Sequence, residues 1–220
     1  MSDLRSFLTA ALGHEPASLA LYEQALTHGS ASRTTYERLE FLGDRVLGLV
    51  VAEWLYERYP DEPEGQMSRR YNALVTRETC ADVGRRIGVP KQIRLGRQAR
   101  EDLATESDNV IGDVVESLIG ALYFDGGYLA VKSFIRTAWA PYLDQQKGAP
   151  VHPKSALQEL AAAKNWGPPV YETISRFGLH HAPTFRIKVS IRGAGEAEAE
   201  GQSKQDAETA AAIALLEIVK

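Results

Sequence analysis

The chain has 220 residues, of which 44% are hydrophobic and 25% are charged, and its net charge is −4. This length allows one large or two modest domains with a real core, and the acidic balance argues against a protein that holds nucleic acid by bulk positive charge. The single cysteine, Cys80, excludes disulfide frameworks and thiolate metal sites and favours a reducing compartment, so we expect the protein in the cytoplasm.

The first 146 residues show the apolar periodicity of helices and no convincing strand alternation. Turn-forming stretches interrupt this pattern at 59–65, 87–92 and 125–127. The opening segment is too short and too interrupted for a signal peptide, and no later stretch is expected to span a membrane. We therefore predict an all-α domain over residues 1–146.

The helix predicted within 36–51 carries three acids on one side. Glu37, Glu40 and Asp44 are spaced by three and four residues, which places them within a narrow arc of a helix. An ordinary solvated helix face is one interpretation, but such a face usually carries basic residues one turn from its acids, and this arc has none. The alternative interpretation is that a positive group from outside the helix lies beside these three acids. The residues expected on the opposite, core-facing side are Leu39, Leu42, Val46, Leu49 and Val50.

A second helix with the same design is predicted within 109–124, where Asp113 and Glu116 lie one turn apart. Converging carboxylates from two helices would repel one another unless a cation or protons neutralised them. The helical rise separates Glu40 from Asp44 by about 6 Å, but Glu37 from Asp44 by about 10.5 Å. We therefore expect Glu40, Asp44, Asp113 and Glu116 to bind a metal, with Glu37 at the edge of the site.

Oxygen ligands without His or Cys suit Mg²⁺, with Mn²⁺ as a substitute, better than Zn²⁺. The Glu-x-x-His pairs of a di-iron bundle are missing from both acidic helices. No protein nucleophile with a partner base suggests itself, so a metal-bound water is the natural attacking group. The chemistry indicates a metal-dependent hydrolase, with phosphoesters as one candidate substrate.

The helical periodicity breaks at 147–152, which is typical of a linker. The remaining residues, 153–220, predict a small α+β domain with the order α-β-β-β-α. Residues 151–220 hold eight basic and eight acidic side chains, so the net negative charge belongs to the helical domain. The predicted elements are helices at 153–165 and 203–220 and strands at 170–178, 184–193 and 196–202.

The stretch ERLEFLGDRVL (37–47) closely resembles the signature of the ribonuclease III family. Further matches are ALTHGS (25–30), EGQMSR (64–69) and IGDVVESLIGALYFDGG (111–127), and 153–220 resembles the double-stranded RNA-binding domain of bacterial members. The resemblance implies a homodimeric, Mg²⁺-dependent endoribonuclease that hydrolyses double-stranded RNA during rRNA and mRNA processing and decay. Its products would carry 5′-phosphate and 3′-hydroxyl ends with short 3′ overhangs.

The resemblance also implies roles for individual residues. The four acids expected to bind metal match the family's metal-binding set, with Asp44 and Glu116 as catalytic residues. Glu37 and Glu64, also expected among the catalytic residues, match acids implicated around the cut site and in RNA or subunit contacts. The positions implied in RNA binding are Ser155, Gln158 and Glu159 on one helix, His181 in a loop, and Lys204 and Gln205 at the start of the last helix.

Three positions depart from the family's pattern. Tyr36 stands where Asn is frequent and Arg45 where a small hydroxyl residue is frequent, and neither is expected to touch the acidic set. Lys204 is the one basic residue where the family usually has two or three. Because fewer phosphate contacts mean weaker, less salt-dependent binding, we predict weak RNA binding by the isolated second domain.

Two rival hypotheses remain beside the nuclease. The first is a non-catalytic, dimeric protein that binds double-stranded RNA, and the second is an unrelated hydrolase that acquired an RNA-binding domain. The complete set of acids favours the nuclease. The apolar stretch 46–56 suits burial either in the core or against a second copy. The expected partners are therefore double-stranded RNA and a second copy, with no membrane and no organic cofactor.

Overall fold

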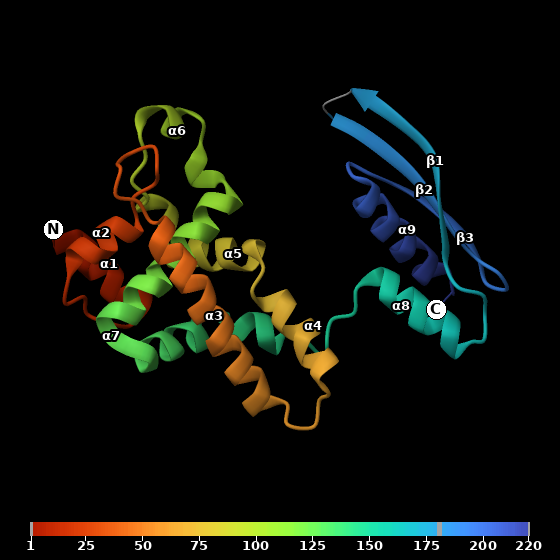
Figure 1. Cartoon of the computed structure of the whole chain (residues 1–220), viewed down its shortest axis with the longest axis horizontal. Helices are drawn as coiled ribbons and strands as arrows, with labels where there is room; N and C mark the ends of the chain where they lie inside the picture. The colour runs from red at the N-terminus through yellow and green to blue at the C-terminus, as the bar shows by residue number, and fades with distance from the viewer. Residues whose placement is uncertain (1, 180–181, 220) are drawn as a thin grey trace. The chain divides into compact units, whose positions relative to one another are not determined.

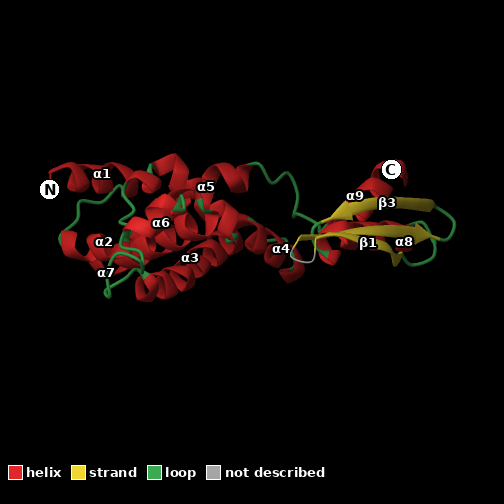
Figure 2. Cartoon of the chain, turned by 90° about the horizontal axis from the view of Figure 1, so that it is seen from above, coloured by secondary structure: helices red, strands yellow, loops and turns green. Residues whose placement is uncertain are grey.

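The computed structural model describes residues 2–179 and 182–219, which form two compact units, Met1–Pro150 and Val151–Lys220. The first unit is built from helices and the second contains the strands (Figures 1 and 2). Both fold predictions, the all-α unit and the α-β-β-β-α order, are confirmed.

Helices make up the regular structure described in the first unit (Figure 1). Short 3₁₀ turns occur at Val89–Lys91 and Ala104–Glu106. The helices are α1 (Ser2–Leu12), α2 (Leu19–Ala25), α3 (Glu37–Arg58), α4 (Glu64–Leu74), α5 (Arg77–Ile87), α6 (Arg97–Glu101) and α7 (Asp108–Asp144).

Local sequence signals account for several helix boundaries. The Thr76 hydroxyl accepts a hydrogen bond from the Thr79 amide and caps the start of α5, and Gly88 ends that helix in the left-handed region at φ 84°. The turn expected at 125–127 is a kink inside α7, because Gly127 adopts φ 72° while the helix continues to Asp144.

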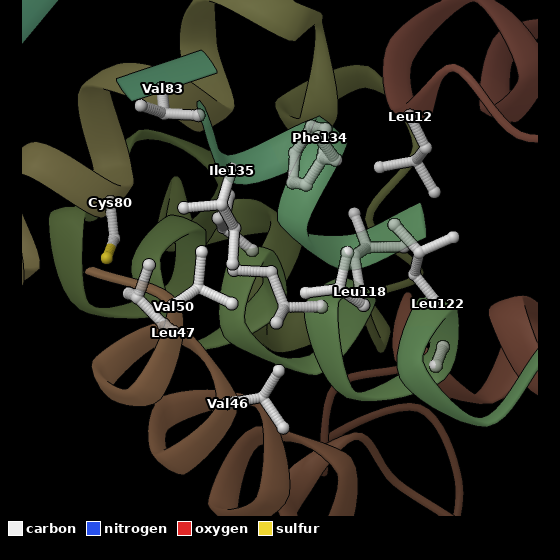
Figure 3. Close-up of a cluster of buried hydrophobic side chains, with 14 of the residues drawn as sticks. Leu12, Val46, Leu47, Val50, Cys80, Val83, Leu118, Leu122, Phe134 and Ile135 are labelled. Carbon is white, nitrogen blue, oxygen red and sulfur yellow. The ribbon is translucent and has the colours of Figure 1, made fainter. Parts of the chain in front are cut away.

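The core of the first unit forms mainly where α3 and α7 cross. Figure 3 shows Val46, Leu47 and Val50 of α3 facing the same cluster as Leu118 and Leu122 of α7. All five are buried. Removing a buried side chain of this size typically costs about 2–5 kcal/mol, so this cluster contributes strongly to stability.

Two glycines bring the backbones of α3 and α7 into direct contact. A Cβ atom on Gly43 would lie 1.7 Å from the Glu116 carbonyl oxygen, and one on Gly120 would lie 2.3 Å from the Leu39 carbonyl oxygen. No larger residue fits at either position without moving backbone. The glycines therefore fix the distance between the two helices that carry the acids.

One sequence expectation about α3 is wrong. Leu39, Val46 and Val50 are buried as predicted, whereas the side of the helix that includes Leu49 is not covered. Leu49 is 58% exposed. Leu49 lies at one edge of the apolar arc, about 100° from Val50, so this edge of the predicted core side faces outward in the single chain.

α7 is long enough, and over an 18-residue window apolar enough, to cross a membrane by length and composition alone. The expectation that no stretch meets this test is thereby corrected. Half of that window is buried inside the unit, and the helix carries Asp113 and Glu116 toward α3. These are the features of a core helix.

The second unit is a three-stranded antiparallel sheet, in the order β1-β2-β3, with two helices against one face (Figure 2). Alternation along β2 buries Ile187, Val189 and Ile191, which pack with Leu157 of the first helix and Leu215 of the last. The elements are α8 (Pro153–Ala163), β1 (Val170–Leu179), β2 (Ala182–Ile191), β3 (Gly195–Gly201) and α9 (Lys204–Val219).

Candidate active site

Three of the predicted acids share one partly buried site beside the α3–α7 crossing. Glu40 comes from α3, and Asp113 and Glu116 come from α7. Each of the three is partly exposed, and their charges influence one another. The two acidic helix faces predicted from spacing alone therefore converge.

Burial and mutual repulsion make these carboxyl groups weak acids. Burial, followed by the charges of Glu40 and Asp113, raises the pKa of Glu116 from 4.5 to about 7. Burial, followed by the charges of Asp113 and Glu37, also raises the pKa of Glu40. Burial raises the pKa of Asp113. Near neutral pH, this cluster therefore has a strong tendency to take up a positive charge.

Three neighbours of the acids were not expected from the sequence. The Tyr36 hydroxyl donates a hydrogen bond of 3.3 Å to Asp113, which corrects the expectation that Tyr36 stays away from the acids. The positive charge of Arg77, at the start of α5, partly offsets the raised pKa values of all three clustered carboxyls. The buried Cys80 thiol lies 3.9 Å from a Glu116 oxygen.

Asp44 is placed differently from the other predicted ligands. Its carboxylate forms an ion pair with the neighbouring Arg45, and the Asp44 side chain is 40% exposed. The expectation that Arg45 avoids the acidic set is therefore wrong. The Arg45 guanidinium also lies over the Phe41 ring, 5.4 Å from its centroid. Asp44 is thus held toward Arg45 in the single chain.

The acids do not form a ready-made metal cage. Among residues 2–179 and 182–219, no three His, Cys, Asp or Glu side chains are arranged so that they could hold a metal ion without rearrangement. The clustered acids nevertheless offer only hard oxygen donors in a polar, partly exposed site. This donor set fits Mg²⁺ or Mn²⁺, which keep several water ligands and need few protein ligands.

The two other predicted acids lie at helix starts. Glu37 is the exposed first residue of α3, and its negative charge contributes to the raised pKa of Glu40. Glu64 is the exposed first residue of α4 and accepts a 2.6 Å hydrogen bond from the Ser68 hydroxyl. The chain before Glu64 is anchored by buried Arg70, which donates two hydrogen bonds to Glu62.

Most of the predicted RNA-binding residues are found together in the second unit. Glu159 is exposed on α8, and His181 lies outside the described residues. The other four line one groove between α8 and the start of α9. The groove residues are Ser155, Gln158, Lys204 and Gln205, joined by His152, Lys154 and Glu208.

Comparison with known proteins gives the same two-part organisation. Residues 18–143 match the model described as Ribonuclease-III-like, and residues 153–219 match the Double-stranded RNA binding motif. A helical nuclease unit followed by such a motif defines an endoribonuclease specific for double-stranded RNA. The chain belongs to the ribonuclease III family.

Individual relatives match over most of the chain. Ribonuclease 3 of Zymomonas mobilis is 56% identical over 214 residues, covering 97% of this chain and 87% of the relative. The enzyme of Methylocella silvestris is 44% identical over 96% of this chain and 91% of the relative. The predicted family and activity are confirmed.

A solved structure agrees with the fold of the nuclease unit. The nuclease domain of the Campylobacter jejuni ribonuclease III is 30% identical, with a TM-score of 0.57 over 66% of this chain and 98% of that domain. That structure is described as having a region involved in dimer formation. Family membership is consistent with a divalent metal requirement, and the second unit supports binding of double-stranded RNA.

Proposed function

We propose that this protein is a homodimeric, Mg²⁺-dependent endoribonuclease that hydrolyses phosphodiester bonds of double-stranded RNA in the cytoplasm. Its products would carry 5′-phosphate and 3′-hydroxyl ends with short 3′ overhangs, as in rRNA and mRNA processing and decay. The observation that carries this proposal is the convergence of Glu40, Asp113 and Glu116 with raised pKa values beside the helix crossing.

The ligands proposed for the metal are Glu40, Asp44, Asp113 and Glu116. When bound there, Mg²⁺ would supply Lewis acidity and lower the pKa of a coordinated water. The chain's own contribution is to hold the carboxylates in place. Asp44, which pairs with Arg45 in the single chain, would join the other three acids, and Mn²⁺ is expected to substitute for Mg²⁺.

Neighbouring side chains prepare the acids for this role. The hydrogen bond from Tyr36 orients Asp113 and favours its ionised form, and the positive charge of Arg77 limits repulsion before a cation arrives. We propose Glu37 and Glu64 as further groups at the cut site, because their carboxylates are exposed where a polar substrate can reach them.

RNA recognition is assigned to the second unit, joined to the first by a linker at 147–152. Ser155, Gln158 and Glu159 present polar groups suited to the sugar hydroxyls of an A-form minor groove. Lys204 and Gln205 lie at the start of α9, where the helix N-terminus attracts a phosphate. His181, which lies between β1 and β2 in the sequence, is proposed as a further RNA contact.

The outer side of α3 supports a homodimer. Phe41, Leu49 and Tyr56 are 68%, 58% and 74% exposed, and their spacing of eight and seven residues places them along one side of α3. Phe124 is 66% exposed and lines a groove with Phe41. A second copy that covers this surface would remove an apolar patch from water.

The rival proposal of a non-catalytic RNA-binding protein predicts a degenerate acidic site. The clustered carboxyls and Asp44 are instead all present, and three of them converge. Cleavage of a long RNA duplex with Mg²⁺ or with excess chelator, beside single-stranded RNA and duplex DNA, tests the choice. We expect the RNA duplex to be cut in Mg²⁺ but not in excess chelator, and we expect no cutting of single-stranded RNA or duplex DNA. Binding without cutting at any Mg²⁺ or Mn²⁺ concentration would favour the rival.

A further inference from the structure

The groove between α8 and α9 contains two lysines and one glutamate. Glu208 lies one turn after Lys204 on α9, and Lys154 faces it from the start of α8. The carboxylate of Glu208 is mostly buried, with 16% of its side chain exposed, whereas the Lys204 side chain is 64% exposed. The acid therefore lies beneath the positive charges that an RNA phosphate would meet.

One carboxylate contacts both lysines. The Glu208 Oε2 atom is 2.5 Å from the Lys154 Nζ atom, and the Oε1 atom is 3.9 Å from the Lys204 Nζ atom. The Lys154 Nζ atom also lies over the Tyr171 ring, 4.8 Å from its centroid. The two lysines and the acid together present one net positive charge instead of two.

We propose that Glu208 sets the RNA affinity of this domain by neutralising Lys154 and weakening the attraction of Lys204. This inference rests on the proposed RNA-binding role of the groove. A phosphate that approaches Lys154 must compete with a carboxylate already in contact, and it also experiences the repulsion of that carboxylate. Weak binding by this domain then follows from an internal ion pair as well as from the small number of basic residues.

The test is Glu208→Gln in the full chain, with binding to an RNA duplex measured in excess chelator between 50 and 200 mM salt. Glutamine keeps the shape and removes the charge. We expect binding about three- to tenfold tighter near 150 mM salt, since one charge at a few ångströms changes affinity by about this factor. The salt slope should become steeper, by up to about 0.9 for one additional phosphate contact.

Two variants control for charge and for structure. Glu200→Gln removes the same charge from β3, where Glu200 pairs with Arg186, and should leave the affinity and the salt slope nearly unchanged. Glu208→Asp keeps the charge and should bind like the wild type. If Glu208→Gln binds no more tightly than Glu200→Gln, or binds more weakly, Glu208 does not restrain RNA binding.

A double-mutant cycle separates neutralisation from a purely structural role. Lys154→Met should weaken binding much more in the Glu208→Gln background than in the wild type, because Lys154 becomes available only there. If Glu208→Gln fails to fold, a loss above about tenfold for Lys154→Met alone would refute the proposal. A wild-type chain that binds no duplex even at low salt would instead overturn the proposed RNA-binding function.

Discussion

Replacing Glu116 with Gln should stabilise the nuclease unit at pH 7.5 when divalent metal is removed. In the folded chain, burial and the charges of Glu40 and Asp113 raise the pKa of Glu116 from 4.5 to about 7. An acid whose pKa is raised by folding stabilises the protein below its unfolded pKa and loses that contribution as pH rises through its folded pKa. The loss therefore falls between about pH 4.5 and pH 7.

The magnitude follows from the same two pKa values. Each pH unit between 4.5 and about 7 corresponds to a little over about 1 kcal/mol, which sets an upper limit of about 3 kcal/mol. Solvent reaches part of the Glu116 side chain, so we expect about 1–2 kcal/mol. For a unit of this size, that difference shifts the melting temperature by about 2–8 °C.

Calorimetric melting at pH 5 and pH 7.5, with chelator and with Mg²⁺, measures the effect. The stability difference between Glu116→Gln and wild type should favour the variant at pH 7.5 with chelator, shrink at pH 5, and reverse with saturating Mg²⁺, because the wild type binds the ion more tightly. Glu101→Gln, an exposed change on α6, should show none of these trends. A Glu116→Gln variant that is less stable than wild type at pH 7.5 without metal would refute the reasoning.

Four further outcomes are expected. In urea titrations, Gly43→Ala should lower the free energy of unfolding by about 3 kcal/mol or more, because its Cβ atom would meet the Glu116 carbonyl oxygen. Gly65→Ala should be close to neutral, since no heavy atom lies within 4 Å of its Cβ position. Asp44→Asn should lower duplex cleavage at least about 100-fold while binding in chelator changes less than about twofold; equal losses of both would contradict a metal-binding role. Glu159→Ala should weaken duplex binding about three- to tenfold in gel-shift titrations, and unchanged binding would remove it from the RNA surface. Phe41→Asp should shift the chain to monomers in sedimentation velocity, and a persistent dimer would place the interface elsewhere.

The sequence was sufficient for the element types and for the convergence of Glu40, Asp113 and Glu116, but not for the position of Asp44, which pairs with Arg45. Residues 1–146 carry a helical period, residues 170–202 alternate as strands, and Asp113 and Glu116 repeat the spacing of the first acidic helix. Each of these patterns is local, so it can be recognised in a single sequence without knowledge of which other elements pack against it. Glycines mark both the ends of helices and kinks within them, so the kink at Gly127 was predicted as the end of a helix.

The remaining details depend on contacts between distant segments. Arg77 comes from a third helix, and no spacing rule links it to the acids on α3 and α7. Tyr36 reaches Asp113 across 77 positions of sequence, and Leu49 is exposed because none of the described elements of its own unit covers that side. Such outcomes are set by packing between elements, which periodicity does not describe.

The glycine contact between α3 and α7 makes the site part of the structural framework of its unit. Because Gly43 and Gly120 bring main chain against main chain, the spacing of the acids is determined by peptide groups rather than by adjustable side chains. The acids cannot separate gradually while the core stays closed. Heating should therefore abolish the arrangement of the acids in the same cooperative transition that separates the two helices, with no intermediate temperature range in which a folded but loosened site persists.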